Sequence, residues 1–178
     1  MAAAQAGGYP YRNRLQRSLV ISSRILSIAA VLSVFVAGAA HADWTSRINP
    51  DGKGASAEAK AEGKALRIGC ARFMGDEMSL TLHGGPFKGM KNVDDAEDPM
   101  KMWIEMPDGR TARNPIDGHY YAPENAFVGR FVVSEVVLQQ FAGGKEMRFT
   151  TAKGNTLLTL PIKGSSKARA DFRKACGL

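Results

Sequence analysis

The chain has few of the residue types that commonly build catalytic or metal sites. Its 178 residues include two cysteines and three histidines. His83 and His119 lie far apart in the sequence with no third ligand at metal-binding spacing, which argues against a zinc site. No G-x-S-x-G elbow, S-x-x-K pair, phosphate-binding loop or dinucleotide fingerprint occurs. We therefore expect a chain without evident catalytic activity, with no catalytic residue and no bound cofactor. A hydrolase whose site is assembled only in the folded structure is a weaker alternative.

Acidic residues are absent from the first 42 positions, which carry four arginines instead. An uncharged apolar run follows at residues 25–40 and ends in the small-residue triplet Ala40-His41-Ala42. A basic region, an apolar region and an A-x-A site together indicate a secretory signal peptide. We predict cleavage after Ala42 and a periplasmic or secreted mature chain, with an uncleaved N-terminal anchor as the alternative. No later apolar run reaches the length of about 20 residues that a spanning helix needs, so we expect no membrane span in the mature chain.

A strong excess of positive charge is also missing from the predicted mature part. The whole chain has a net charge of +7, but residues 43–178 have 20 basic and 17 acidic side chains. Proteins that bind nucleic acid concentrate far more positive charge than this. We therefore expect no nucleic-acid partner.

The two cysteines, Cys70 and Cys176, both lie in the predicted mature part. An even number of cysteines in an oxidising compartment favours a disulfide, and two cysteines allow one pairing. A catalytic thiol is the alternative reading. It would need a partner base, and neither His83 nor His119 belongs to a recognisable Cys/His motif.

Short segments with alternating apolar residues dominate residues 57–178. Period-2 alternation with turn residues between the segments predicts antiparallel strands. Serine caps and helical spacing predict two short helices, at 135–141 and 167–176. Residues 43–56 are expected to form an extended segment and loop, and the stretch between residues 114 and 126 to form a second loop. The predicted strands are 57–61, 66–70, 78–82, 100–106, 110–113, 127–133, 145–151 and 156–162.

This order of elements predicts a single mainly-β domain over residues 57–178. The expected fold is an antiparallel β-sandwich or open barrel with a short internal helix and a C-terminal helix. Cys70 lies on the apolar face of its strand, and Cys176 lies on the apolar face of the last helix. We therefore expect the disulfide to pin that helix to the sheet.

The chain resembles two groups of small exported proteins. The residues that carry the resemblance are the strand Leu66-Arg67-Ile68-Gly69-Cys70, the helix that follows Ser134, and the Ala-rich C-terminal helix that ends in Cys176. In these features and their order the chain is similar to the small periplasmic proteins associated with type VI secretion (the TagO/VasI type) and to the invasion-associated locus B proteins. The resemblance implies a non-enzymatic accessory role in the cell envelope.

Three further clusters have a functional and a structural interpretation. Met100, Met102 and His83 could bind Cu(I), which prefers soft ligands, but methionines that alternate along one strand face are also typical core residues. An acidic loop at residues 94–98 could bind Ca²⁺, although it lacks the spacing of a calcium loop and a solvated loop explains it. The basic face of the last helix could contact lipid headgroups or could be an ordinary exposed face; its residues are Lys163, Lys167, Arg169, Arg173 and Lys174.

These observations predict an exported accessory module without evident catalytic activity. Its expected partner is an envelope protein or glycan. The alternative function is periplasmic Cu(I) binding through Met100, Met102 and His83.

Overall fold

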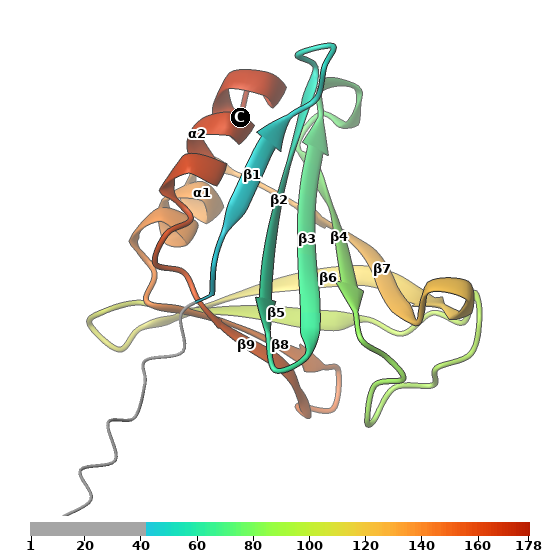
Figure 1. The fold of residues 1–178 in the computed structure, drawn as a ribbon. Helices are drawn as coiled ribbons and strands as arrows, with labels where there is room; N and C mark the ends of the chain where they lie inside the picture. The colour runs from blue at the N-terminus through green and yellow to red at the C-terminus, as the bar shows by residue number, and fades with distance from the viewer. Residues whose placement is uncertain (1–41) are drawn as a thin grey trace, which may run out of the picture. The chain divides into compact units, whose positions relative to one another are not determined.

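A computed structural model describes residues 42–178 of the chain (Figure 1). Within these residues, nine antiparallel strands form one sheet in the order β1-β2-β3-β4-β7-β6-β5-β8-β9. The predicted export signal, except for Ala42, lies outside the described residues. The strands are β1 (Thr45–Ile48), β2 (Gly54–Ala61), β3 (Lys64–Ala71), β4 (Glu77–His83), β5 (Met100–Glu105), β6 (Thr111–Tyr121), β7 (Ala126–Val132), β8 (Glu146–Thr151) and β9 (Thr156–Pro161); the helices are the 3₁₀ turns η1 (Arg72–Met74) and η2 (Ala122–Glu124) and the α-helices α1 (Glu135–Gly143) and α2 (Ser166–Cys176).

The sheet curls into a half-barrel, which confirms the predicted mainly-β fold. Its curvature brings the two ends of the sheet near each other: β2 contacts β9, and the indole N–H of Trp44, just before β1, donates to the carbonyl of Pro161 at 2.9 Å. Pro161 lies on the edge strand β9, as expected for a residue that cannot donate a backbone hydrogen bond.

The concave face of the sheet holds the core. Leu66, Ile68 and Cys70 point inward from β3, and Leu80 and Leu82 point inward from β4, as the alternation predicts. Side chains of the other strands and of both α-helices complete a single apolar cluster. Charged and polar side chains occupy the alternate positions, so the convex face of the sheet is turned to solvent.

Helix α1 begins where the sequence predicts and runs two residues beyond the predicted end, to Gly143. The Ser134 hydroxyl accepts a hydrogen bond from the backbone N–H of Val137 at 3.3 Å, and Gly144 follows the last helical residue. Leu138 and Phe141 are buried against the core. Helix α2 packs on β1, β2 and β3, but its N-cap residue Ser165 makes no side-chain capping bond, so the prediction of a serine hydroxyl cap is wrong there.

Strand β6 contradicts the predicted loop between residues 114 and 126. It runs without a break from Thr111 to Tyr121 and pairs with β5 over its first half and with β7 over its second half. Pro115 and Gly118, which suggested a loop, are both strand residues. A strand that changes partner along its length makes a corner in a curved sheet, and corner strands accommodate such residues.

Strand β1 was also not expected, because residues 45–48 show no clear apolar alternation. Its edge is held by α2, since the hydroxyl of Ser46 donates to a carboxylate oxygen of Asp171 at 2.6 Å and the ammonium of Lys167 bonds the Ser46 carbonyl and hydroxyl oxygens. The predicted loop at residues 43–56 therefore contains β1 and the start of β2.

A candidate binding surface on the convex face of the sheet

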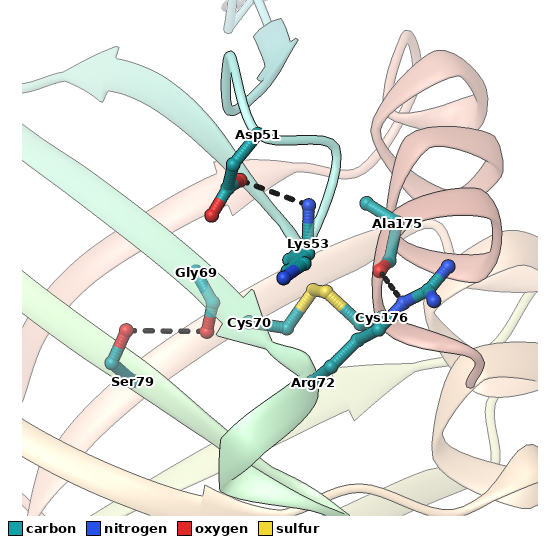
Figure 2. The surroundings of a disulfide bond; sticks show 8 residues. All are labelled: Asp51, Lys53, Gly69, Cys70, Arg72, Ser79, Ala175 and Cys176. Carbon is teal, nitrogen blue, oxygen red and sulfur yellow. Dashed lines mark hydrogen bonds between the residues drawn. A yellow bond between two sulfur atoms is a disulfide. The ribbon is translucent and has the colours of Figure 1, made fainter.

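The predicted disulfide joins Cys70 at the end of β3 to Cys176 at the end of α2, with a Cα–Cα distance of 6.1 Å. Figure 2 shows that the bond lies next to the start of η1, the short turn that leads into β4. Arg72 strengthens this attachment: its Nε donates to the Ala175 carbonyl at 2.8 Å, and its backbone N–H donates to the Lys53 carbonyl at 2.9 Å. The start of η1 is thus fixed to both the sheet and the last helix.

The turn that is fixed in this way displays an aromatic ring to solvent. Phe73 is 91% exposed, the highest exposure among the large apolar side chains of the described residues. Val132, at the end of β7, is 60% exposed. Folded proteins gain stability by burying such groups, so two exposed apolar side chains, one of them an aromatic ring on a turn anchored at Arg72, suggest a contact with another molecule.

Phe73 and Val132 line one end of a hollow of about 850 Å³ on the convex face of β4, β7 and β6. Outward-facing side chains of the three strands form its floor, because β4 pairs with β7 and β7 pairs with β6. Charged groups lie across this floor, and Glu77 and Arg130 form an ion pair of 3.5 Å. The remaining lining comes from Met74, Ser79, Pro115, Asp117, Gly118, His119, Val128, Gly129 and Phe131.

The other end of the hollow is acidic. A smaller depression of about 330 Å³ shares Asp117 and His119 with the hollow and adds Asp95 and Glu97 from the acidic loop. The imidazole Nε2 of His119 lies 3.8 Å from a carboxylate oxygen of Asp95. The carboxylates of Asp95, Glu97 and Asp117 outnumber the nearby cations. These cations are Lys91, whose ammonium bonds the Glu97 carbonyl, and Arg130, which pairs with Glu77 and lies opposite Asp117 in the strand register.

The acidic loop divides into structural and exposed members. Asp98 is buried and accepts a hydrogen bond from the backbone N–H of Lys91, while Asp94 accepts one from the backbone N–H of Ala122. Asp95 and Glu97 instead line the depression. Within residues 42–178 no three His, Cys, Asp or Glu side chains are placed to hold a metal ion together.

The proposed copper ligands do not come together. Met100 and Met102 are each 1% exposed on the concave face, where they pack in the core. His83 is an outward-facing residue of β4, and its Nδ1 lies 4.0 Å from a carboxylate oxygen of Glu124. The two methionines and the histidine thus lie on opposite faces of the sheet, and the core interpretation of the methionines holds.

The basic face of α2 is partly neutralised. Lys167 pairs with Asp171, and Arg173 pairs with Glu135 of α1. The Arg173 pair connects α2 to α1, and the hydrogen bonds of Lys167 and Asp171 to Ser46 connect α2 to β1. No helix in residues 42–178 combines the length and apolarity required to cross a membrane.

Sequence reasoning missed Phe73 and the hollow. The sequence did contain a signal for Phe73: it is an aromatic residue in the turn between two predicted strands, outside their apolar alternation. The floor of the hollow was not visible because it depends on the pairing of β4 with β7, two strands far apart in the chain. Comparison of the chain with protein-family models, with curated proteins and with solved structures finds no match.

Proposed function

We propose that this chain is an exported accessory module of the cell envelope that binds a partner protein through the convex hollow. The observation that carries the proposal is Phe73, which is 91% exposed at the rim of an 850 Å³ hollow on a turn fixed by a disulfide. The N-terminal signal pattern and the disulfide support the export part of the proposal.

The lining of the hollow defines the chemistry of the partner. Phe73 and Val132 offer apolar contact at one end, and Asp95, Glu97 and Asp117 offer negative charge at the other. A partner segment with an apolar side chain followed by lysine or arginine residues is complementary to both ends. Burial of the Phe73 ring contributes about 1.5–3 kcal/mol, which corresponds to at least about tenfold in affinity.

A peptide array tests the partner's chemistry. Octapeptides that combine one apolar residue with two or three lysines are titrated against the full-length chain, alongside the same peptides with glutamate in place of lysine. Members of the lysine set are expected to bind and the glutamate set is not. Phe73→Ser is expected to weaken binding about tenfold or more, while Val136→Ser, at an exposed position on α1 outside the hollow, leaves it unchanged.

The exposure of Phe73 makes this comparison interpretable. Because the ring makes little contact with the fold, Phe73→Ser is expected to keep the unfolding midpoint of the native chain. Equal binding of the lysine and glutamate sets, or equal affinity of the Phe73→Ser and native chains, would refute the proposal.

Export has a separate test, the intact mass of the protein recovered from its own cells. A chain that begins at Asp43 and gains two hydrogens on reduction is the expected result. A full-length chain, or one with two freely alkylated thiols, would contradict the envelope role.

A further inference from the structure

A second cluster of binding groups lies on the convex face of β6, β5 and β8. Trp103 on β5 pairs directly with Arg113 on β6 and with Arg148 on β8. Directly paired residues of antiparallel strands point to the same side of the sheet, with Cβ atoms about 5 Å apart. The three side chains therefore form an Arg-Trp-Arg row across three neighbouring strands.

The indole at the centre of this row is held in place. Its N–H donates to the Thr150 hydroxyl at 2.9 Å, and the guanidinium carbon of Arg148 lies 5.9 Å from the ring centroid. That distance is near the outer limit of a cation–π contact. Arg148 thus lies near the ring without close stacking on it.

Both guanidinium groups of the row are free to bind an anion. Arg113 and Arg148 are exposed, and in the described part of the chain neither forms an ion pair. Lys101 adds a third positive charge two residues from Trp103 on the same strand face, where its ammonium bonds the Ala152 carbonyl. The acids on this face are Glu105, which pairs with Lys145, Glu146, and Asp117, which lies four residues from Arg113 on β6.

We propose that the Arg-Trp-Arg row binds an anionic glycan, a saccharide chain that carries carboxylate or phosphate groups. A guanidinium group binds either anion through two parallel hydrogen bonds. A flat indole suits the apolar face of a sugar ring. The open sheet face fits a polymer, whereas small ligands require a concave pocket.

The composition of this face argues against a membrane as the ligand. The exposed large apolar side chains of the described residues are Phe73, Val93, Tyr121, Val132 and Val136, and of these only Tyr121 lies on β6, β5 or β8, at the end of β6 eight residues from Arg113. A protein surface that binds a bilayer inserts apolar side chains between the headgroups. The apolar group of the row is the Trp103 indole, which is half-buried and held by its hydrogen bond to Thr150.

Fluorescence of Trp103 tests the site directly. The chain has two tryptophans, so the variant Trp44→Phe leaves Trp103 as the single indole. The full-length variant is titrated with a uronic-acid hexamer (hexagalacturonate) and with the uncharged maltohexaose. We expect hexagalacturonate to change the Trp103 emission, with an affinity that falls as salt is added, and maltohexaose to have no effect.

Matched charge variants locate the binding. Arg113→Gln with Arg148→Gln is expected to weaken hexagalacturonate binding about tenfold or more. Arg47→Gln with Arg67→Gln removes the same charge from β1 and β3 of the sheet and is expected to leave affinity unchanged. Phe73→Ser also leaves it unchanged, because the row does not include the hollow, so this site and the proposed protein site are tested separately.

Three results would overturn the assignment. These are no emission change with hexagalacturonate, equal binding of maltohexaose, and an equal loss of affinity in the two double variants. If the protein does not bind hexagalacturonate but sediments with phosphatidylglycerol vesicles, the row binds a lipid surface instead.

Discussion

Removal of the disulfide is expected to destabilise the fold by several kcal/mol. The bond closes a loop between residues 106 positions apart. The chain-entropy model gives about 4–5 kcal/mol for a loop of this size, which is a large share of the roughly 5–15 kcal/mol that holds a typical domain folded. Cys70 and Cys176 are 6% and 8% exposed, so each substitution also changes a buried site.

Two single variants and their combination separate the bond from the thiols. Cys70→Ser and Cys176→Ser each break the same bond, so each is expected to lose as much unfolding free energy as the double variant. Urea unfolding followed by tryptophan fluorescence measures the loss, and the urea dependence should steepen because the unfolded chain without a crosslink exposes more surface.

The remaining contacts of α2 predict that the variants without the disulfide still fold, so that their unfolding free energy can be measured. Lys167 and Asp171 still hold α2 to Ser46 of β1, and Arg173 still pairs with Glu135 of α1. Losses that differ between the two single variants by more than about 1 kcal/mol, or a loss below about 1 kcal/mol in the double variant, would refute the reasoning.

Two smaller changes test the sheet corner and the attachment of α2. Gly129→Ala should cost about 1–3 kcal/mol of unfolding free energy in thermal melts, because the new Cβ would lie 2.6 Å from a ring carbon of Phe127 and 2.8 Å from the Asp117 carbonyl oxygen. Gly143→Ala is the control, since its new Cβ would meet one atom at 3.5 Å. An equal loss of stability in the two variants would refute the predicted clash. Hydrogen bonds from Lys167 and Ser46 hold the pKa of Asp171 below its ordinary value, so its contribution to stability is present above that ordinary pKa and is lost as the pH falls through the lowered pKa. Asp171→Asn should therefore lower the unfolding midpoint at neutral pH, and its difference from the native chain should shrink in acid; a difference that is constant with pH would exclude this linkage.

Local patterns in the sequence predict the strands whose inner face is buried. Alternation identifies β3 and β4 because Leu66, Ile68, Leu80 and Leu82 are all core residues. It misses β1, where the stabilising partner of Ser46 is Asp171 on the last helix, 125 residues away. No window of neighbouring residues contains that contact.

The error at β6 has a different cause, since Pro115 and Gly118 have the composition of a loop. In the structure Pro115 lies in the half of β6 that pairs with β5, close to the point where the strand changes partner. Gly118 lies opposite Gly129, where the ring of Phe127 occupies the space that side chains would need. Both residues fit the bend of β6, and that bend depends on tertiary packing that a local sequence pattern does not reveal.

The two proposed sites depend on strand order, which sequence alone does not supply. Trp103 and Lys101 alternate with Met100 and Met102 along their strand, and the structure places them on its outward face. The neighbours that make Trp103 a candidate site, Arg113 and Arg148, become visible once β6 and β8 are known to flank β5.

Strand β6 connects the two proposed sites and separates their charges. Arg113 belongs to the Arg-Trp-Arg row, and Asp117 belongs to the hollow. Four residues of extended strand place them about 13 Å apart on the same side of the sheet. The two sites adjoin at Pro115, which lines the hollow and lies opposite Lys101. The charges of Asp117 and Arg113 are separated by more than a Debye length of about 8–10 Å, so each ligand meets mainly charge of the opposite sign. A surface of uniform charge could bind one of these ligands but would repel the other, so the charge division along β6 is the feature that would let a single small domain hold an envelope protein against a glycan.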